Sequence, residues 1–126
     1  MSLRAPLGRV LGLGTAKDGT DHWWAQRISG VALALLGLWF VASLVMLPSL
    51  EHYTVVDFIS RPINTVLLAL LCLTIAYHSH LGVQVVIEDY VHGHGVKIVS
   101  LVLSRFVHIF VAVLSIYAIL RIGLGA

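Results

Sequence analysis

Charged side chains are scarce in this sequence. Asp, Glu, Lys and Arg make up 11% of its 126 residues, less than half of the roughly 25% that is typical of soluble domains. A water-exposed surface could hardly be built from so few charges, and hydrophobic residues reach 59%. The charges are also collected in short segments between long apolar runs. This composition excludes an ordinary soluble domain and indicates a bundle of helices that spans a bilayer.

Cysteine is nearly absent as well. The single cysteine, Cys72, lies inside an apolar run, so it cannot form an internal disulfide and is interpreted as a small buried apolar residue. An iron–sulfur cluster needs several cysteine ligands. The sequence therefore excludes such a cluster within this chain.

Three apolar runs are long enough to cross a membrane. They extend over residues 28–47, 63–87 and 98–120. Twenty residues of helix at ~1.5 Å per residue reach ~30 Å, the thickness of the hydrocarbon core. Ser60 and Pro62 suit the start of the second run as its cap and first-turn proline. We therefore predict an all-α integral membrane protein of three transmembrane helices, preceded by an N-terminal segment over residues 1–27.

Basic residues are divided unevenly between the two ends of these runs. Most of them lie before the first run, in the loop after the second, or early in the third: Arg4, Arg9, Lys17, Arg27, Lys97 and Arg105. Because cytoplasmic flanks are rich in Lys and Arg, we expect the N-terminus and that loop to face the cytoplasm. Trp23 and Trp24 suit the aromatic belt at this interface. Glycines interrupt the segment before them, so no cleavable signal peptide is expected.

Histidine is plentiful, and His78, His80 and His108 fall inside the apolar runs. Ionisable side chains at this depth are costly and tend to mark functional sites. Because His78 and His80 are two residues apart, they point to nearly opposite sides of a helix and cannot both bind one flat cofactor. Gly82, one turn after His78, leaves space beside the imidazole for a macrocycle.

The pattern around His78 supports two interpretations. An imidazole nitrogen can bind haem iron while apolar walls hold the porphyrin, which would make His78 an axial ligand. Such a haem would be non-covalent, because the sequence has no Cys-x-x-Cys-His motif. Alternatively, His78 is a structural histidine that bonds a carbonyl group on a neighbouring helix. Spacing alone leaves both interpretations open.

A second polar pair, Asp89 and Tyr90, lies where the second run leaves the membrane. Asp89 follows His78 closely enough in helical phase to share its face within ~20°, at a distance of ~16 Å along the axis. A tyrosine hydroxyl can donate to a quinone carbonyl, and a carboxylate beside it can orient that hydroxyl or relay protons. The alternative is an ordinary interfacial tyrosine and a helix-end aspartate.

The order of these residues is specific. The stretch from His78-Ser79-His80 through Gly82 to Asp89-Tyr90-Val91-His92-Gly93 closely resembles the hydrophobic membrane anchor of succinate dehydrogenase, the D-type subunit of respiratory complex II. The segment Gln26-Arg27-Ile28-Ser29-Gly30 is similar to the Arg-containing segment that complex II anchors share. The C-type anchor carries an Arg-His pair shortly after the glycine, which this sequence lacks. The resemblance is therefore to the D-type anchor.

The resemblance implies a subunit without catalytic residues of its own. It would anchor a succinate:ubiquinone oxidoreductase of the electron transport chain and the tricarboxylic acid cycle in the bacterial inner membrane. The implied partners are a C-type cytochrome b anchor of three helices, an iron–sulfur subunit, a flavoprotein subunit and membrane lipid, with no nucleic acid. The alternatives are an anchor of a fumarate reductase or of another b-type cytochrome quinone oxidoreductase, and a transporter or purely structural subunit.

The resemblance also implies roles for single residues. The His78 position is an axial ligand of haem b iron, beside which Gly82 packs. The Tyr90 position binds ubiquinone, and the Asp89 position assists through water. Arg27 either contacts a haem propionate or the quinone pocket, or only sets the topology.

The other polar residues are expected to have supporting roles. Arg105 either snorkels to the interface or contacts a propionate or a partner subunit. His108 is expected to form an interhelical hydrogen bond and is the rival haem ligand, whereas His80 is expected to pack or to face a partner. The two loop histidines, His92 and His94, are too few for a zinc site.

Overall fold

The computed structural model describes residues 17–125, and their side chains from residue 20 onward. The chain forms four helices in this range: α2 (Lys17–Met46), α3 (His52–Ser60), α4 (Pro62–Tyr90) and α5 (His94–Gly123). All but α3 are long and apolar enough to cross a membrane. The prediction of an all-α membrane protein with three spans is confirmed. The first part of the predicted N-terminal segment, including Arg4 and Arg9, lies outside the described residues.

The three long helices exceed the thickness of the bilayer core. Their candidate spans hold 27 residues in α2, 29 in α4 and 30 in α5. At ~1.5 Å per residue each is ~40–45 Å long, against ~30 Å of hydrocarbon. Helices of this length tilt or extend into the headgroup region. The helices α4 and α5 therefore continue past the predicted spans 63–87 and 98–120. The positions of the membrane boundaries stay a prediction.

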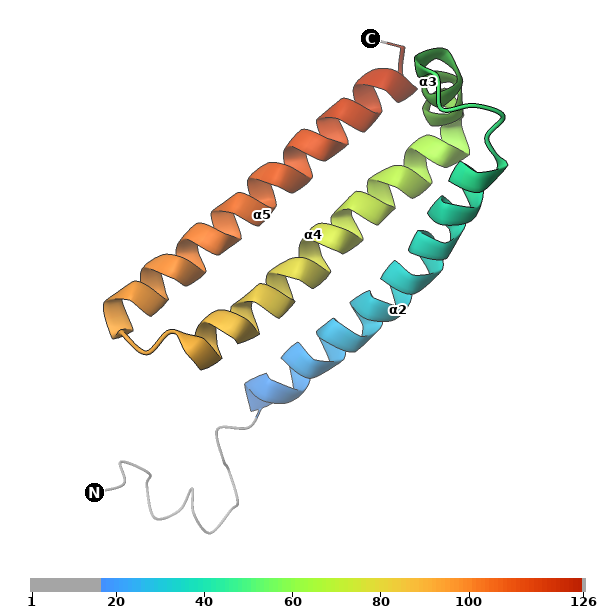
Figure 1. Cartoon of the computed structure of the whole chain (residues 1–126). Helices are drawn as coiled ribbons and strands as arrows, with labels where there is room; N and C mark the ends of the chain where they lie inside the picture. Colours follow the sequence, from blue (N-terminus) through green and yellow to red (C-terminus); the bar gives the residue numbers. More distant parts are fainter. Residues whose placement is uncertain (1–16, 126) are drawn as a thin grey trace, which may run out of the picture.

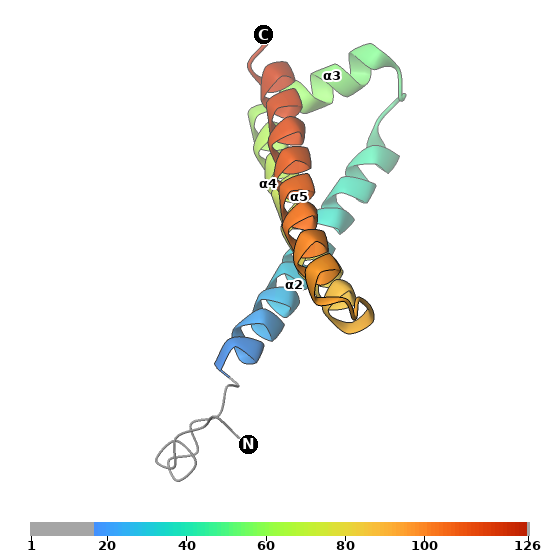
Figure 2. The same ribbon diagram turned by 90° about the vertical axis from the view of Figure 1, so that its left-hand side faces the viewer.

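The central helix of the bundle is α4. It packs against both α2 and α5, whereas α2 and α5 make no contact with each other within residues 17–125. The N-terminal end of α2 and the α4–α5 turn lie at one end of the bundle, and α3 and the C-terminus lie at the other (Figure 1). Figure 2 shows α2 crossing the α4–α5 pair obliquely. Side chains on one side of α4 therefore contact α2, and those on the other side contact α5.

The short helix α3 is the element that the sequence analysis missed. It has nine residues, too few to span a membrane or to be stable alone. Phe58 of α3 is buried, and its ring stacks on Trp39 of α2 with 6.2 Å between ring centroids. Tertiary packing thus contributes to holding α3 in place, and local sequence patterns do not report such a contact.

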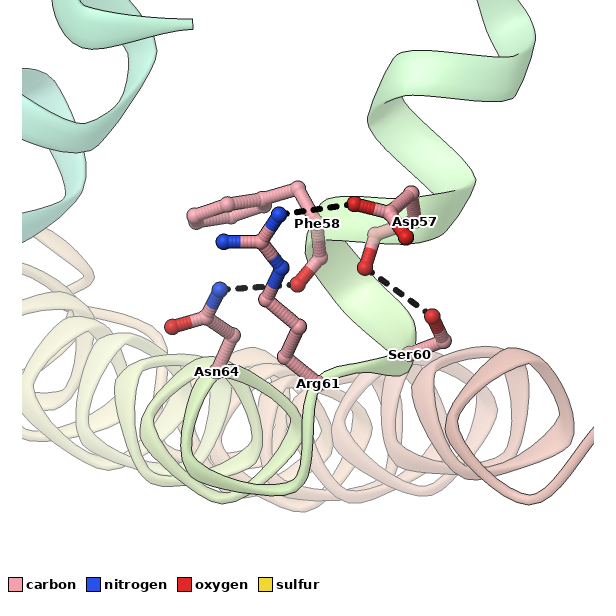
Figure 3. A network of polar contacts seen from close by, with 5 residues as sticks. All are labelled: Asp57, Phe58, Ser60, Arg61 and Asn64. Atoms are coloured by element: carbon pink, nitrogen blue, oxygen red, sulfur yellow. Dashed lines mark hydrogen bonds and ion pairs between the residues drawn. The ribbon is translucent and has the colours of Figure 1, made fainter.

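Side chains close the sharp turn from α3 into α4. Arg61 Nη2 donates to Asp57 Oδ2 at 2.9 Å, and Asn64 Nδ2 donates to the Phe58 carbonyl at 2.8 Å (Figure 3). Pro62 begins α4 as predicted, because a first-turn residue needs no N–H donor. The prediction that Ser60 caps α4 is wrong. Ser60 is the last residue of α3, its hydroxyl donates to the Asp57 carbonyl, and Arg61 takes the cap position.

Most apolar side chains of the bundle face outward. The buried hydrophobic residues among those described are Phe58, Leu68, Leu71 and Leu81, and none lies on α5. Such a surface would aggregate in water. It suits contact with lipid and with other membrane helices, where small residues and polar contacts, rather than apolar burial, hold helices together.

The helices α5 and α4 approach each other closely at Gly123. A Cβ atom added there would collide with the side chain of Thr65 on α4. Thr65 is only 7% exposed, and its hydroxyl donates to the Ile59 carbonyl at 2.6 Å. Because Thr65 is fixed in this way, it cannot move aside for a larger neighbour.

We predict that Gly123→Ala weakens the association of α4 and α5 by about 1–3 kcal/mol, the usual cost of overpacking. Unfolding of the purified chain by sodium dodecyl sulfate in mixed micelles measures this change. Gly37→Ala is the matched control, because nothing lies within 4 Å of the Cβ atom it adds. An equal loss of stability in the two variants would contradict the packing described here.

Candidate functional site

His78 lies near the middle of α4 and faces α2. Its Nδ1 atom is 3.0 Å from Ser29 Oγ, and its Nε2 atom is 3.5 Å from the Gln26 Nε2 atom. Both partners belong to α2, separated by about one helical turn. The imidazole is therefore held between two polar side chains at the α2–α4 contact.

The hydrogen bonds around His78 form a consistent set. The Ser29 hydroxyl donates its one proton to the Gln26 backbone carbonyl at 3.1 Å, so its oxygen accepts a hydrogen bond from His78 Nδ1–H. The amide nitrogen of Gln26 carries donors only, so His78 Nε2 accepts. Both contacts indicate an imidazole with its proton on Nδ1 and a lone pair on Nε2.

Two glycines allow α2 and α4 to approach at this point. A Cβ atom on Gly30 would lie 3.3 Å from His78 Cε1, closer than most side chains tolerate. A Cβ atom on Gly82 would lie 3.6 Å from Gln26 Nε2. The Gln26 side chain thus lies beside Gly82, and the role of Gly82 in making room for a macrocycle stays a prediction.

Three buried polar atoms of α2 and α4 have no hydrogen-bond partner among the described residues: Gln26 Oε1, His22 Nε2 and His80 Nδ1. An unpartnered buried polar atom costs about 1–3 kcal/mol, so each one calls for an explanation in a native structure. Water or another polar group from a partner or ligand would satisfy them. Gln26 belongs to the set around His78, which makes this the most polar part of the α2–α4 contact.

The atoms around His78 fit a haem iron. A haem-binding histidine needs one nitrogen with a free electron pair and a second nitrogen that donates a hydrogen bond. His78 meets both requirements through Nε2 and through Nδ1–H to Ser29. The Gln26 amide at 3.5 Å from Nε2 is the end of a flexible side chain, so it would have to turn aside for a ligand at that nitrogen.

The other two membrane histidines lie on the opposite side of α4. His80 faces α5, as its spacing from His78 predicted, with its ring centroid 5.5 Å from that of His108. His108 Nδ1–H donates to the Ser104 carbonyl at 2.7 Å, and Nε2 accepts from the Ser79 hydroxyl at 3.1 Å. This is the interhelical hydrogen bond expected of His108. It uses both ring nitrogens and leaves no lone pair for iron.

A groove between α4 and α5 contains the charged side chain of Arg105. It has a volume of about 470 Å³, and its polar lining residues are His80, Gln84 and Arg105. Arg105 is exposed, and no salt bridge involves it among the described residues. Its side chain is thus available both for snorkelling and for a partner, the two roles expected of it.

Asp89 and Tyr90 are the last two residues of α4. Both are exposed, Tyr90 to 77%. The preceding residue, Glu88, holds the turn into α5: its backbone carbonyl accepts from Lys97 Nζ at 2.8 Å and its carboxylate accepts from Gln84 at 2.8 Å. The acid and the phenol take no part in these hydrogen bonds and remain accessible from outside the chain.

Arg27 lies at the same end of the bundle. Its Cζ atom is 5.3 Å from the centroid of the Trp23 ring, which packs edge-on against Trp24 at 5.0 Å. A cation above an indole ring is a stabilising contact that suits the membrane interface. Both interpretations of Arg27 remain predictions.

The α2 side of this site was not predicted from the sequence. Gln26, Ser29 and Gly30 stood out there only as part of a segment that resembles complex II anchors. The available signal was a serine beside a glycine in an apolar helix, since polar and small residues in membrane helices tend to mark helix contacts. Which histidine they contact depends on the crossing of α2 and α4, and one sequence does not show it.

The whole chain is similar to known membrane anchors. The family described as succinate dehydrogenase/fumarate reductase transmembrane subunit matches residues 1–120. The chain belongs to this family. The succinate dehydrogenase hydrophobic membrane anchor subunit of Rickettsia bellii is 31% identical over 95% of this chain and 96% of its own length. The predicted resemblance is confirmed.

Two further relatives in this family support the same assignment. The succinate dehydrogenase hydrophobic membrane anchor subunit of Paracoccus denitrificans is 31% identical over 91% of this chain and 88% of its own length. The succinate dehydrogenase membrane anchor subunit of Reclinomonas americana is 32% identical over 74% of this chain and 80% of its own length.

We predict that Gly30→Leu breaks the contact between His78 and Ser29, because the new side chain needs the space that His78 Cε1 occupies. The ¹⁵N resonances of the labelled histidine ring would then change from one tautomer to a mixture. Gly37→Leu is the control, since the space around Gly37 is open. Unchanged His78 resonances in Gly30→Leu would disprove the close approach of α2 and α4.

Proposed function

We propose that this chain is the membrane anchor subunit of a succinate:ubiquinone oxidoreductase, and that it contributes one axial ligand of haem b and part of the ubiquinone-reduction site. The family, matched over most of the chain, supports the anchor role. The observation that carries the haem role is the His78 ring, which Ser29 holds at Nδ1 so that the lone pair of Nε2 can bind a metal.

Residues of both α2 and α4 would hold the haem. His78 would bind the iron, and Gly82 would provide space once the Gln26 side chain turns aside. The C-type partner anchor would supply the second ligand. When bound, the haem supplies a centre that accepts and returns one electron at a time.

Ubiquinone reduction needs two electrons and two protons at the quinone oxygens. The Tyr90 hydroxyl donates a hydrogen bond to one quinone carbonyl, and Asp89 relays protons from water. Both side chains are exposed at the end of α4, so a quinone and the iron–sulfur subunit can reach them. The electrons originate in succinate, which the flavoprotein subunit oxidises.

The charges of the chain support the orientation and the partners of this proposal. Arg27, Lys97 and the end of α4 lie at one end of the bundle, the side expected to face the cytoplasm of a bacterium. The soluble subunits would dock there, above the inner membrane. The outward apolar faces of α2 and α5, together with exposed Arg105, suit packing against a three-helix C-type anchor and lipid.

A fumarate reductase anchor that works with menaquinone is the second candidate, because the family description includes fumarate reductase. The relatives named above are succinate dehydrogenase anchors, which favours the first proposal. The quinone preference of the purified complex decides between the two. A higher kcat/KM with menaquinol and fumarate than with succinate and ubiquinone would reverse the assignment.

We predict that His78→Ala removes the b-type haem band from the assembled complex, because the substitution deletes the imidazole ligand. The dithionite-reduced minus oxidised absorption spectrum of the purified complex measures it. His80→Ala is the control, since His80 lies on the other side of α4. A b-type band of normal height in His78→Ala would refute the ligand assignment.

We also predict that Tyr90→Phe lowers succinate:ubiquinone reductase activity about tenfold or more, which corresponds to the loss of roughly one hydrogen bond in the transition state. Succinate oxidation with a soluble dye as electron acceptor should be unchanged, because it bypasses the quinone. Tyr53→Phe is the matched control: Tyr53 is 82% exposed at the opposite end of the bundle. Equal activities in Tyr90→Phe and Tyr53→Phe would exclude a quinone contact at Tyr90.

A further inference from the structure

We propose that Ser29 is a positioning residue for the haem ligand: it holds His78 with the proton on Nδ1, so that Nε2 is the nitrogen that binds iron. The inference rests on the haem role proposed above for His78. It adds the α2 helix to the ligand site, and it names the ring nitrogen that coordinates the metal.

The position of Ser29 is fixed by its own helix. The side chain is only 7% exposed, and its hydroxyl proton goes to the Gln26 backbone carbonyl three residues earlier. A backbone carbonyl within a helix cannot turn away as a side chain can. The Ser29 oxygen therefore presents a lone pair to His78 Nδ1 at 3.0 Å from a nearly rigid support.

The glycine next to Ser29 makes this hydrogen bond possible. Gly30 has no Cβ atom, and one placed there would approach His78 Cε1 to 3.3 Å and His78 Nδ1 to 3.8 Å. The ring thus lies directly on the backbone of α2. This close approach limits rotation of the ring and brings Nδ1 within reach of a side chain as short as serine.

A comparison with His108 shows what distinguishes His78. Both rings donate from Nδ1 to an oxygen, His78 to Ser29 and His108 to the Ser104 carbonyl. At Nε2, however, His108 accepts from the Ser79 hydroxyl at 3.1 Å, whereas His78 is 3.5 Å from the end of the flexible Gln26 side chain. Of these two Nε2 atoms, that of His78 is the one that can exchange its partner for a metal without breaking a short hydrogen bond.

The hydrogen bond has consequences for a bound iron. An acceptor at Nδ1–H increases the basicity of Nε2, which strengthens the bond to iron and favours the ferric form. Its loss should raise the reduction potential of the haem. Loss of such an outer partner typically lowers metal affinity about 10- to 100-fold.

The test compares Ser29→Ala, Ser29→Thr and Ser43→Ala in the assembled complex. We measure haem retention, the reduction potential by redox titration, and the electron paramagnetic resonance signal of the ferric haem. Ser29→Ala should lose haem about 10- to 100-fold more readily and titrate at a higher potential. Ser29→Thr keeps the hydroxyl and should stay close to the wild type.

Ser43→Ala is the matched control. Ser43 lies on the same helix and donates to the Trp39 carbonyl at 2.8 Å, so its removal costs a similar local hydrogen bond away from His78. A wild-type potential, signal and haem content in Ser29→Ala would overturn the positioning role, as would equal shifts in Ser29→Ala and Ser29→Thr. If His78→Ala itself keeps the haem, the ligand assignment fails instead, so the two failures are distinguishable.

Discussion

The contact between His78 and the backbone of α2 is the constraint on which the rest of the site depends. Gly30 has no side chain to hold the two helices apart, and the imidazole of His78 occupies the space that such a side chain would need. Within the part of the chain that the structure describes, the polar contacts of this ring are with Ser29 and Gln26. One missing Cβ atom thus determines the tautomer of a histidine on another helix.

Much of this fold follows from the sequence, because three apolar runs in a chain with few charges leave few alternatives to a helical bundle. The opposite orientation of His78 and His80 also follows, since helical periodicity fixes it. The helix α3 does not, because it depends on the stacking of Phe58 against Trp39, which are distant in sequence. Ser60 was misplaced for a similar reason: it ends one helix, whereas local patterns alone suggest that it begins the next.

The residues of the candidate site likewise fall into those that the sequence predicts and those that depend on how the helices pack. The residues of α4 and its end, His78, Gly82, Asp89 and Tyr90, could be named from their order along one helix. The α2 residues could not, because their role arises from how two helices cross, and many crossings suit the same apolar patterns. His108 illustrates the difference: like His78 it is a histidine inside an apolar run, and only the structure shows that both of its ring nitrogens are hydrogen-bonded within the chain.

The absence of contact between α2 and α5 has a consequence for how the chain matures. A membrane protein is synthesised from its N-terminus, so α2 and α4 enter the bilayer before α5. Gln26, Ser29 and Gly30, the α2 residues that approach His78, are then already present. The contact between His78 and α2 can therefore form while the ribosome is still translating α5.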